Sequence, residues 1–179
     1  MTPQPIRARH PSRADIGIGR RHGDPSTRLV LKPVAPKTGY VDGAWWPYSD
    51  DLVTELPRLL TALTKRLSTV RLVAYHLVEW DSAPAELVFD EEPVRLDSQS
   101  HATAHTVDLL GSDNRRLLLL VVPSGSDPGD AYAAMTSAAT TNNTSTAADL
   151  LQIGIRKRRE RKQRAAAVRR WAARTTSVN

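Results

Sequence analysis

The sequence predicts an α+β fold, with a single domain built on a mainly antiparallel sheet of about five to six strands. Residues 70–80 and 116–122 are rich in strand-forming residues, and the first of these runs alternates in the manner of a strand. The loop 111–114 is short enough to join the strands 106–110 and 116–122 as a hairpin. Between these runs and the N-terminus, leucines recur at helical spacing and predict one amphipathic helix: Leu52, Leu56, Leu59, Leu60, Leu63 and Leu67.

The elements before the main strand follow from local signals. Residues 28–32 alternate as a strand and are ended by Pro33 and Pro36. The aromatic segment 40–48 then reads as a structured loop. Ser49, Asp50 and Asp51 supply an N-cap for the leucine-striped helix, which Pro57 should kink or divide.

The strand 70–80 is expected to be central, with its even positions, Val70 to Trp80, on the buried face. Two short strands, 86–89 and 94–96, precede the hairpin. A helix opens at Asp127-Pro128, and its inward residues are expected to be Tyr132, Met135 and Ala139. Ser145 or Thr146 can cap a last short helix through Leu151, and the sequence beyond Arg156 has good helix propensity.

Charge divides the chain into three parts. Residues 1–32 hold seven basic and two acidic residues, and residues 156–179 hold ten basic residues and one acidic residue. Residues 33–155 hold eight basic and sixteen acidic residues, so an acidic body lies between two basic ends. We therefore divide the chain into a disordered basic arm (1–27), an α+β domain (28–151) and a basic C-terminal tail that can be helical (152–179).

Composition also bounds the class of protein. The absence of cysteine excludes disulfides, thiolate zinc sites and thiol catalysis. The longest aliphatic run, 117–122, is far shorter than the ~20 residues that span a bilayer, and no apolar secretory signal is present. These features predict a soluble protein of the cytoplasm without a transmembrane segment.

The aromatic segment 40–48 is the first candidate site, because it holds four of the nine aromatic residues in the chain. Adjacent tryptophans on an extended chain point in opposite directions, so one of Trp45 and Trp46 can enter the core while the other lines a cleft. The residues expected around such a cleft are Tyr40, Asp42, Trp45, Trp46, His76, Trp80, His105 and Asp108. His76 could equally be a core histidine with a satisfied hydrogen bond, and Glu79 should lie on the opposite face of its strand.

Other chemistry has weaker support. His76, His101 and His105 do not complete a metal-binding motif, since 97–104 reads as a loop and no carboxylate spacing accompanies them. Neither a Gly-x-Ser-x-Gly nucleophile elbow nor a phosphate-binding loop is present. We therefore assign no catalytic residue, no metal and no cofactor from the sequence.

The basic tail is the second candidate site. Clustered cations bind phosphate backbones through counterion release, and an aromatic ring can stack on a base. A solvated tail without a partner remains the alternative. The residues expected to contact nucleic acid are Arg156, Lys157, Arg158, Arg159, Arg161, Lys162, Arg164, Arg169, Arg170 and Trp171.

Five blocks of the sequence, in order, resemble the DUF5994 family of uncharacterised actinobacterial proteins. They are 31–33, 38–47 (Thr-Gly-Tyr-Val-Asp-Gly-Ala-Trp-Trp-Pro), 74–77 with Trp80-Asp81, 105–109 and 119–123. The resemblance covers about residues 28–151 and leaves the Arg-rich tail outside. It implies an actinobacterial, cytoplasmic origin and no particular reaction.

Three functions remain open from the sequence. The favoured one is a non-enzymatic interaction protein whose Arg-rich tails contact nucleic acid. The alternatives are a small-ligand binder or enzyme that uses the aromatic cleft, and a scaffold that binds a protein partner through an exposed tryptophan.

Overall fold

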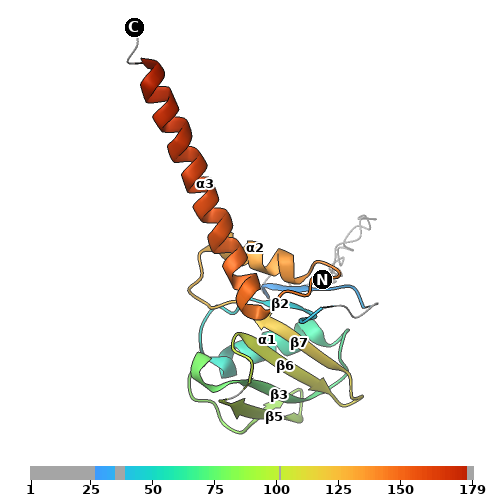
Figure 1. Cartoon of the computed structure of the whole chain (residues 1–179). Coiled ribbons are helices and arrows are strands. Elements are labelled where there is room, and N and C mark those ends of the chain that lie inside the picture. Colours follow the sequence, from blue (N-terminus) through green and yellow to red (C-terminus); the bar gives the residue numbers. More distant parts are fainter. Residues whose placement is uncertain (1–26, 35–38, 101, 177–179) are drawn as a thin grey trace, which may run out of the picture.

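The computed structural model describes residues 27–34, 39–100 and 102–176. Over these residues the chain forms one α+β domain with a seven-stranded mixed sheet and three α-helices (Figure 1). The elements are β1 (Leu29–Leu31), β2 (Gly43–Trp45), α1 (Leu52–Leu63), β3 (Val70–His76), the 3₁₀ turn η1 (Leu77–Glu79), β4 (Glu86–Phe89), β5 (Glu92–Gln99), β6 (Thr106–Gly111), β7 (Arg116–Val121), α2 (Pro128–Ala138) and α3 (Ala147–Thr176).

The sheet has the strand order β1-β2-β7-β6-β3-β5-β4. Four of the six neighbouring pairs in the described sheet are antiparallel, whereas β2 pairs with β7 and β3 pairs with β5 in parallel. The prediction of five to six mainly antiparallel strands is therefore imprecise. The additional strand is β2, which lies in the aromatic segment that the sequence suggested was a loop. It is only three residues long and has no alternating pattern of its own.

Helix α1 forms as the leucine spacing predicts and covers one face of the sheet. Asp51 is its N-cap, and its carboxylate accepts hydrogen bonds from the backbone N–H groups of Val53 and Thr54. The helix continues through Pro57, so the proline does not divide it. Its leucines pack against β3, β5, β6 and β7 in the larger of two cores.

The second core lies on the opposite face of the sheet, at the end that carries β2 and β7. Here α2 and the first turns of α3 cover Ala44, Trp46, Leu120 and Val122. In Figure 1 these two helices lie together at that end of the sheet, while α3 continues well beyond it. The sheet is thus covered on both faces at one end and on a single face at the other.

The predicted alternation of buried side chains is wrong for most of strand β3. Val73 and Tyr75 are buried toward α1, whereas Leu72, Ala74 and His76 are half-buried on the other face. The pairing of β3 with β6 shifts register between Val70 and Leu72, and this irregularity reverses the phase of the side chains. Within β3, Val70 is therefore the only inward even position. The strand ends at His76, and Trp80, which follows η1, is buried in the same core as Val70.

Helix α2 buries Met135 as expected, and Ala139 is half-buried, but Tyr132 is not on the buried face. Its buried residues include Ala131, Ala134, Met135 and Ala138, whereas the side chain of Tyr132 is 59% exposed. The small residues allow α2 to approach the sheet closely. Tyr132 lies at the rim, where its ring meets Trp46 edge to face at a centroid distance of 5.6 Å.

Candidate functional site

The aromatic cleft expected from the sequence is not assembled. Trp45 is 2% exposed in the α1 core and stacks on Trp80 with ring centroids 5.3 Å apart. Trp46 is 4% exposed in the other core, and its indole N–H donates to the carbonyl of Ser124 at 3.2 Å. The two rings point in opposite directions, as expected, but both faces are covered, so neither tryptophan is available as an exposed anchor.

The remaining predicted cleft residues are dispersed. The hydroxyl of Tyr40 lies 2.9 Å from that of Thr103. Asp42 accepts a hydrogen bond from the backbone N–H of Leu118 at 2.9 Å. The first contact joins the β1–β2 loop to the chain before β6, and the second joins the same loop to β7.

His76 and Asp108 lie on the part of the sheet that α2 and α3 leave uncovered. Asp108 accepts hydrogen bonds from the guanidinium of Arg116, including one from Nε at 2.7 Å, and this contact raises the pKa of Arg116. Nδ1 of His76 is buried without a hydrogen-bond partner among the described residues. His101, the third candidate in the metal hypothesis, lies outside the described residues.

His105 is the predicted cleft residue with the most specific environment. Its backbone has φ +60°, the left-handed conformation that non-glycine residues seldom adopt. Glu79 holds it there, because Oε1 accepts from the backbone N–H at 2.6 Å and lies 3.1 Å from Nδ1. Glu79 belongs to η1, not to the far face of a strand, and that position allows the contact.

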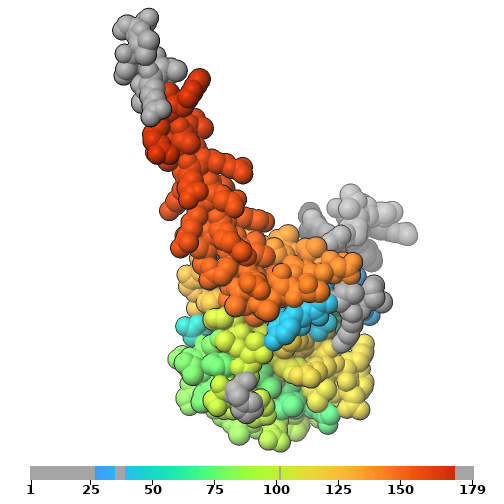
Figure 2. Space-filling view, in the orientation of Figure 1, coloured from blue at the N-terminus to red at the C-terminus, as the bar shows by residue number. Residues whose placement is uncertain are grey.

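The basic residues of the tail lie on α3, which is continuous from Ala147 to Thr176 and not a short helix followed by a separate segment. Residues 156–170 hold nine basic residues and one acidic residue, and all except Arg158 are exposed. Figure 2 shows this part of α3 projecting from the surface of the domain. Val168 and Trp171, also on this part, are 66% and 70% exposed.

The base of α3 is held against α2 by close backbone contact. Gly154 is buried against Asp130, where a Cβ atom would lie 2.4 Å from the Asp130 Cα. One turn later, Arg158 pairs with Asp130 at 3.1 Å and with Asp127 at 3.6 Å. Asp127 also caps α2 by accepting from the backbone N–H of Gly129 at 2.9 Å. Arg158, a predicted phosphate contact, is therefore engaged within the protein.

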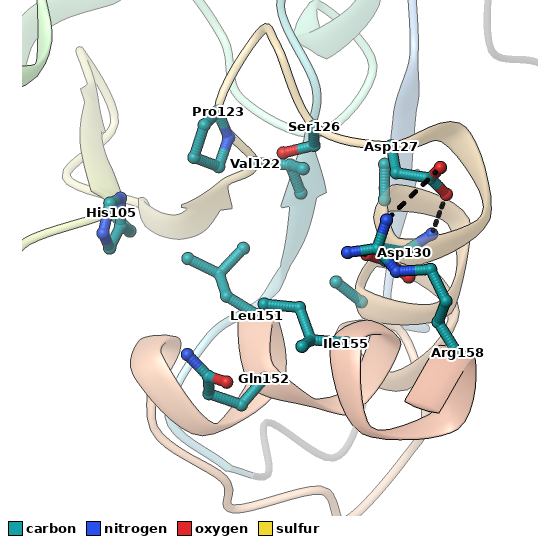
Figure 3. Close-up of a pocket in the computed structure, with 12 residues that line it drawn as sticks. His105, Val122, Pro123, Ser126, Asp127, Asp130, Leu151, Gln152, Ile155 and Arg158 are labelled. Atoms are coloured by element: carbon teal, nitrogen blue, oxygen red, sulfur yellow. Dashed lines mark hydrogen bonds and ion pairs between the residues drawn. The ribbon is translucent and has the colours of Figure 1, made fainter. Parts of the chain in front are cut away.

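A pocket of about 340 Å³ lies between α2, the base of α3 and the end of β7; we call it the α2–α3 pocket. Figure 3 shows His105 at one end and the Asp127, Asp130 and Arg158 cluster at the other. The apolar side chains that line it are Val122, Pro123, Ala131, Ala134, Leu151 and Ile155. Ser126 and Gln152 complete its polar lining.

Sequence reasoning identified His105 and Arg158 separately and missed the pocket between them. Asp130 and Gly154 carried no signal in isolation, since one resembles an ordinary first-turn acid and the other a helix-weakening glycine. A glycine within a helix-forming basic segment was the available clue, because such a glycine often marks close helix packing.

The described residues also bear on two other classes of site. No helix among them is both long and apolar enough to cross a bilayer. They also contain no cluster of three or more His, Cys, Asp or Glu side chains that could hold a metal ion.

Comparison with known proteins gives a family without an assigned activity. No curated protein and no solved structure matches the chain. The profile of DUF5994, described as a family of unknown function, matches residues 28–138, which include β1 to β7, α1 and α2. The match ends before α3, so the basic helix and one wall of the α2–α3 pocket lie outside it. The chain therefore belongs to the DUF5994 family.

Proposed function

We propose that the protein binds nucleic acid through the exposed part of α3, by contacts to the phosphate backbone. The observation that carries the proposal is the density of charge on a helix that leaves the domain. Residues 156–170 have a net charge of +8 and span about 22 Å at the rise of an α-helix. Duplex DNA presents one phosphate charge per about 1.7 Å of axis, and the helix presents cations at a density of the same order.

Repulsion between the cations of α3 also favours the binding of an anionic partner. Lys157 and Arg161 lie four residues apart, and Arg159 and Lys162 lie three apart, so these like charges repel one another on the helix surface. Glu160 is the single acidic residue between 156 and 170. Phosphates along the helix would relieve this repulsion and stabilise α3.

The charge of the domain favours contact at the outer part of α3. Residues 33–155 carry a net charge of −8, which repels phosphates from the body of the protein. Arg158 is neutralised by Asp127 and Asp130 at the base. Phosphates should therefore meet the residues beyond it, which are Arg159, Arg161, Lys162, Arg164, Arg169 and Arg170.

The proposal is tested by the salt dependence of binding. Fluorescence anisotropy would follow the full chain on a short DNA duplex and on a single-stranded RNA of the same length. A test variant replaces Lys162, Arg164, Arg169 and Arg170 with glutamine, which retains helix propensity. A control variant makes the same change at four exposed basic residues of the domain: Arg58, Lys65, Arg71 and Arg95.

We expect the slope of log affinity against log salt for the duplex to become shallower by about 3 to 4 in the test variant, since each lost phosphate contact contributes about 0.9. The control variant should keep the slope of the unmodified protein. Equal losses in the two variants would indicate a general effect of net charge. That outcome, or no measurable binding by the full chain at low salt, would refute the role of α3.

A further inference from the structure

We infer that the α2–α3 pocket binds a small organic cation, in which a protonated amine is attached to an apolar body. This inference is independent of nucleic-acid binding, because it rests on the inner surface of α3 and not on its exposed cations. The pocket, at about 340 Å³, lies at the lower end of the size range of small-molecule sites. Its walls are mostly apolar and its charged groups are gathered at one end.

Asp130 lines this pocket, and one of its two carboxylate oxygens lacks a hydrogen-bond donor among the described residues. Its side chain is 9% exposed, and Oδ2 lies 3.1 Å from a guanidinium nitrogen of Arg158. Oδ1 is buried and has no hydrogen-bond partner among the described residues. A buried carboxylate oxygen without a donor is unfavourable, and an N–H group of a ligand would satisfy it.

The balance of charge favours a cation over an anion. Asp127 and Asp130 face one guanidinium, that of Arg158. At the opposite end, the Nδ1 atom of His105 faces a third carboxylate, Glu79, at 3.1 Å. A ligand anion in the pocket would therefore meet the carboxylates of Asp127 and Asp130, whereas an ammonium group would be attracted to them.

The apolar walls distinguish an organic cation from a metal ion. Ala131 and Ala134 of α2, Leu151 and Ile155 of α3, and Val122 after β7 all line the pocket. An alkyl or aryl group would bury apolar surface there. A metal ion would find the carboxylates of Asp127 and Asp130 already paired with the cation Arg158. Among the described residues, no His, Cys, Asp or Glu side chain joins these two carboxylates to complete a metal-binding cluster.

Arg158 determines how the amine would enter. Its side chain is 40% exposed, so the guanidinium can move toward solvent without unpacking the core. An ammonium group would then take its place on the Asp130 carboxylate. The amine and Arg158 therefore compete for one carboxylate, so removal of Arg158 should raise the affinity for the amine. An ion pair with a purely structural role would produce no such change.

The test measures binding of n-hexylammonium by the full-length protein, from saturable chemical-shift changes in the methyl groups of Leu151 and Ile155. n-Hexanol and hexanoate serve as neutral and anionic probes of the same length. Asp130→Asn removes the acceptor charge and Arg158→Gln removes the competitor. Asp127→Asn is the matched control, since that carboxylate lies at the exposed rim.

We expect hexylammonium to bind more tightly than hexanol, and hexanoate to bind most weakly. Asp130→Asn should weaken hexylammonium by about tenfold or more, Arg158→Gln should strengthen it, and Asp127→Asn should have a smaller effect than Asp130→Asn. Native-like spectra of each variant would show that it folds, and Arg158→Gln tests the inference even if Asp130→Asn does not fold.

Three results would overturn the inference. Equal affinity for the amine and the alcohol would show an apolar site without recognition of charge. Tighter binding of hexanoate, or weaker amine binding in Arg158→Gln, would show that the guanidinium attracts an anion. The absence of saturable shifts with hexylammonium would show that the pocket does not bind such amines.

Discussion

Replacement of Gly154 with alanine should destabilise the protein, although the same change ordinarily stabilises a helix. In an exposed helix interior, alanine is favoured over glycine by about 1 kcal/mol. At position 154, however, the new Cβ would lie 2.4 Å from the Cα of Asp130 and 2.5 Å from its carbonyl oxygen. Both are backbone atoms, so no side-chain rotation relieves the overlap.

The size of the effect follows from that geometry. Ordinary van der Waals contact begins near 3.4 Å, so α3 must move away from α2 by about 1 Å. Overpacking of this kind typically costs about 1–3 kcal/mol, and the movement also lengthens the Arg158–Asp130 ion pair. We therefore expect Gly154→Ala to lower the free energy of unfolding by about 1–2 kcal/mol after the gain in helix propensity.

Denaturant unfolding followed by tryptophan fluorescence would measure the change. Gly125→Ala is the matched control, because a Cβ there would meet no atom within 4 Å, and it should alter stability by less than about 0.5 kcal/mol. Equal or greater stability of Gly154→Ala would refute the close packing of α2 and α3. It would also remove the basis for the pocket between them.

Three further outcomes follow from contacts elsewhere. Trp45→Ala should lower the free energy of unfolding by about 3–5 kcal/mol, because the ring is fully buried and stacked on Trp80; thermal and denaturant unfolding would measure it. Arg28→Ala should lower the free energy of unfolding by about 1–2 kcal/mol, since the guanidinium lies 3.7 Å from the ring centroid of Trp46 and 3.9 Å from that of Tyr48. In the same assay, Arg28→Lys should recover only part of this loss. Hydrogen bonds from Thr54 lower the pKa of Asp51 below 3.8, so its contribution is present above that pH and is lost as the pH falls through the lowered pKa. The stability difference between Asp51→Ala and the unmodified protein should accordingly shrink on acidification, and no such change would contradict this role of the cap.

Local signals were sufficient for the parts of the fold that local interactions determine. Leucine spacing and Asp51 located α1, and residues 111–114 located the turn between β6 and β7. The phase of β3 could not be read in the same way, because the irregularity at Val70 depends on pairing with β6. Likewise β2 is a strand because it pairs with both β1 and β7.

The candidate sites likewise divide into features that local sequence predicts and features that depend on tertiary contacts. The cations of α3 were evident from composition alone, whereas the burial of both adjacent tryptophans required knowledge that α2 covers the second face of the sheet. The α2–α3 pocket could not be predicted from the sequence, since it brings together His105, Asp130 and Arg158 from three separate segments of the chain. Sequence patterns carry no direct measure of such distances.

Strand β2 has a consequence for how the domain unfolds. Its last residue, Trp45, belongs to the core beneath α1, and the next residue, Trp46, belongs to the core beneath α2. A single peptide unit joins the two residues. If one indole leaves its core, the backbone that positions the other indole therefore moves as well. We therefore expect the two halves of the domain to unfold in one cooperative transition, with amides on α1 and α2 exposed to hydrogen exchange through the same global opening.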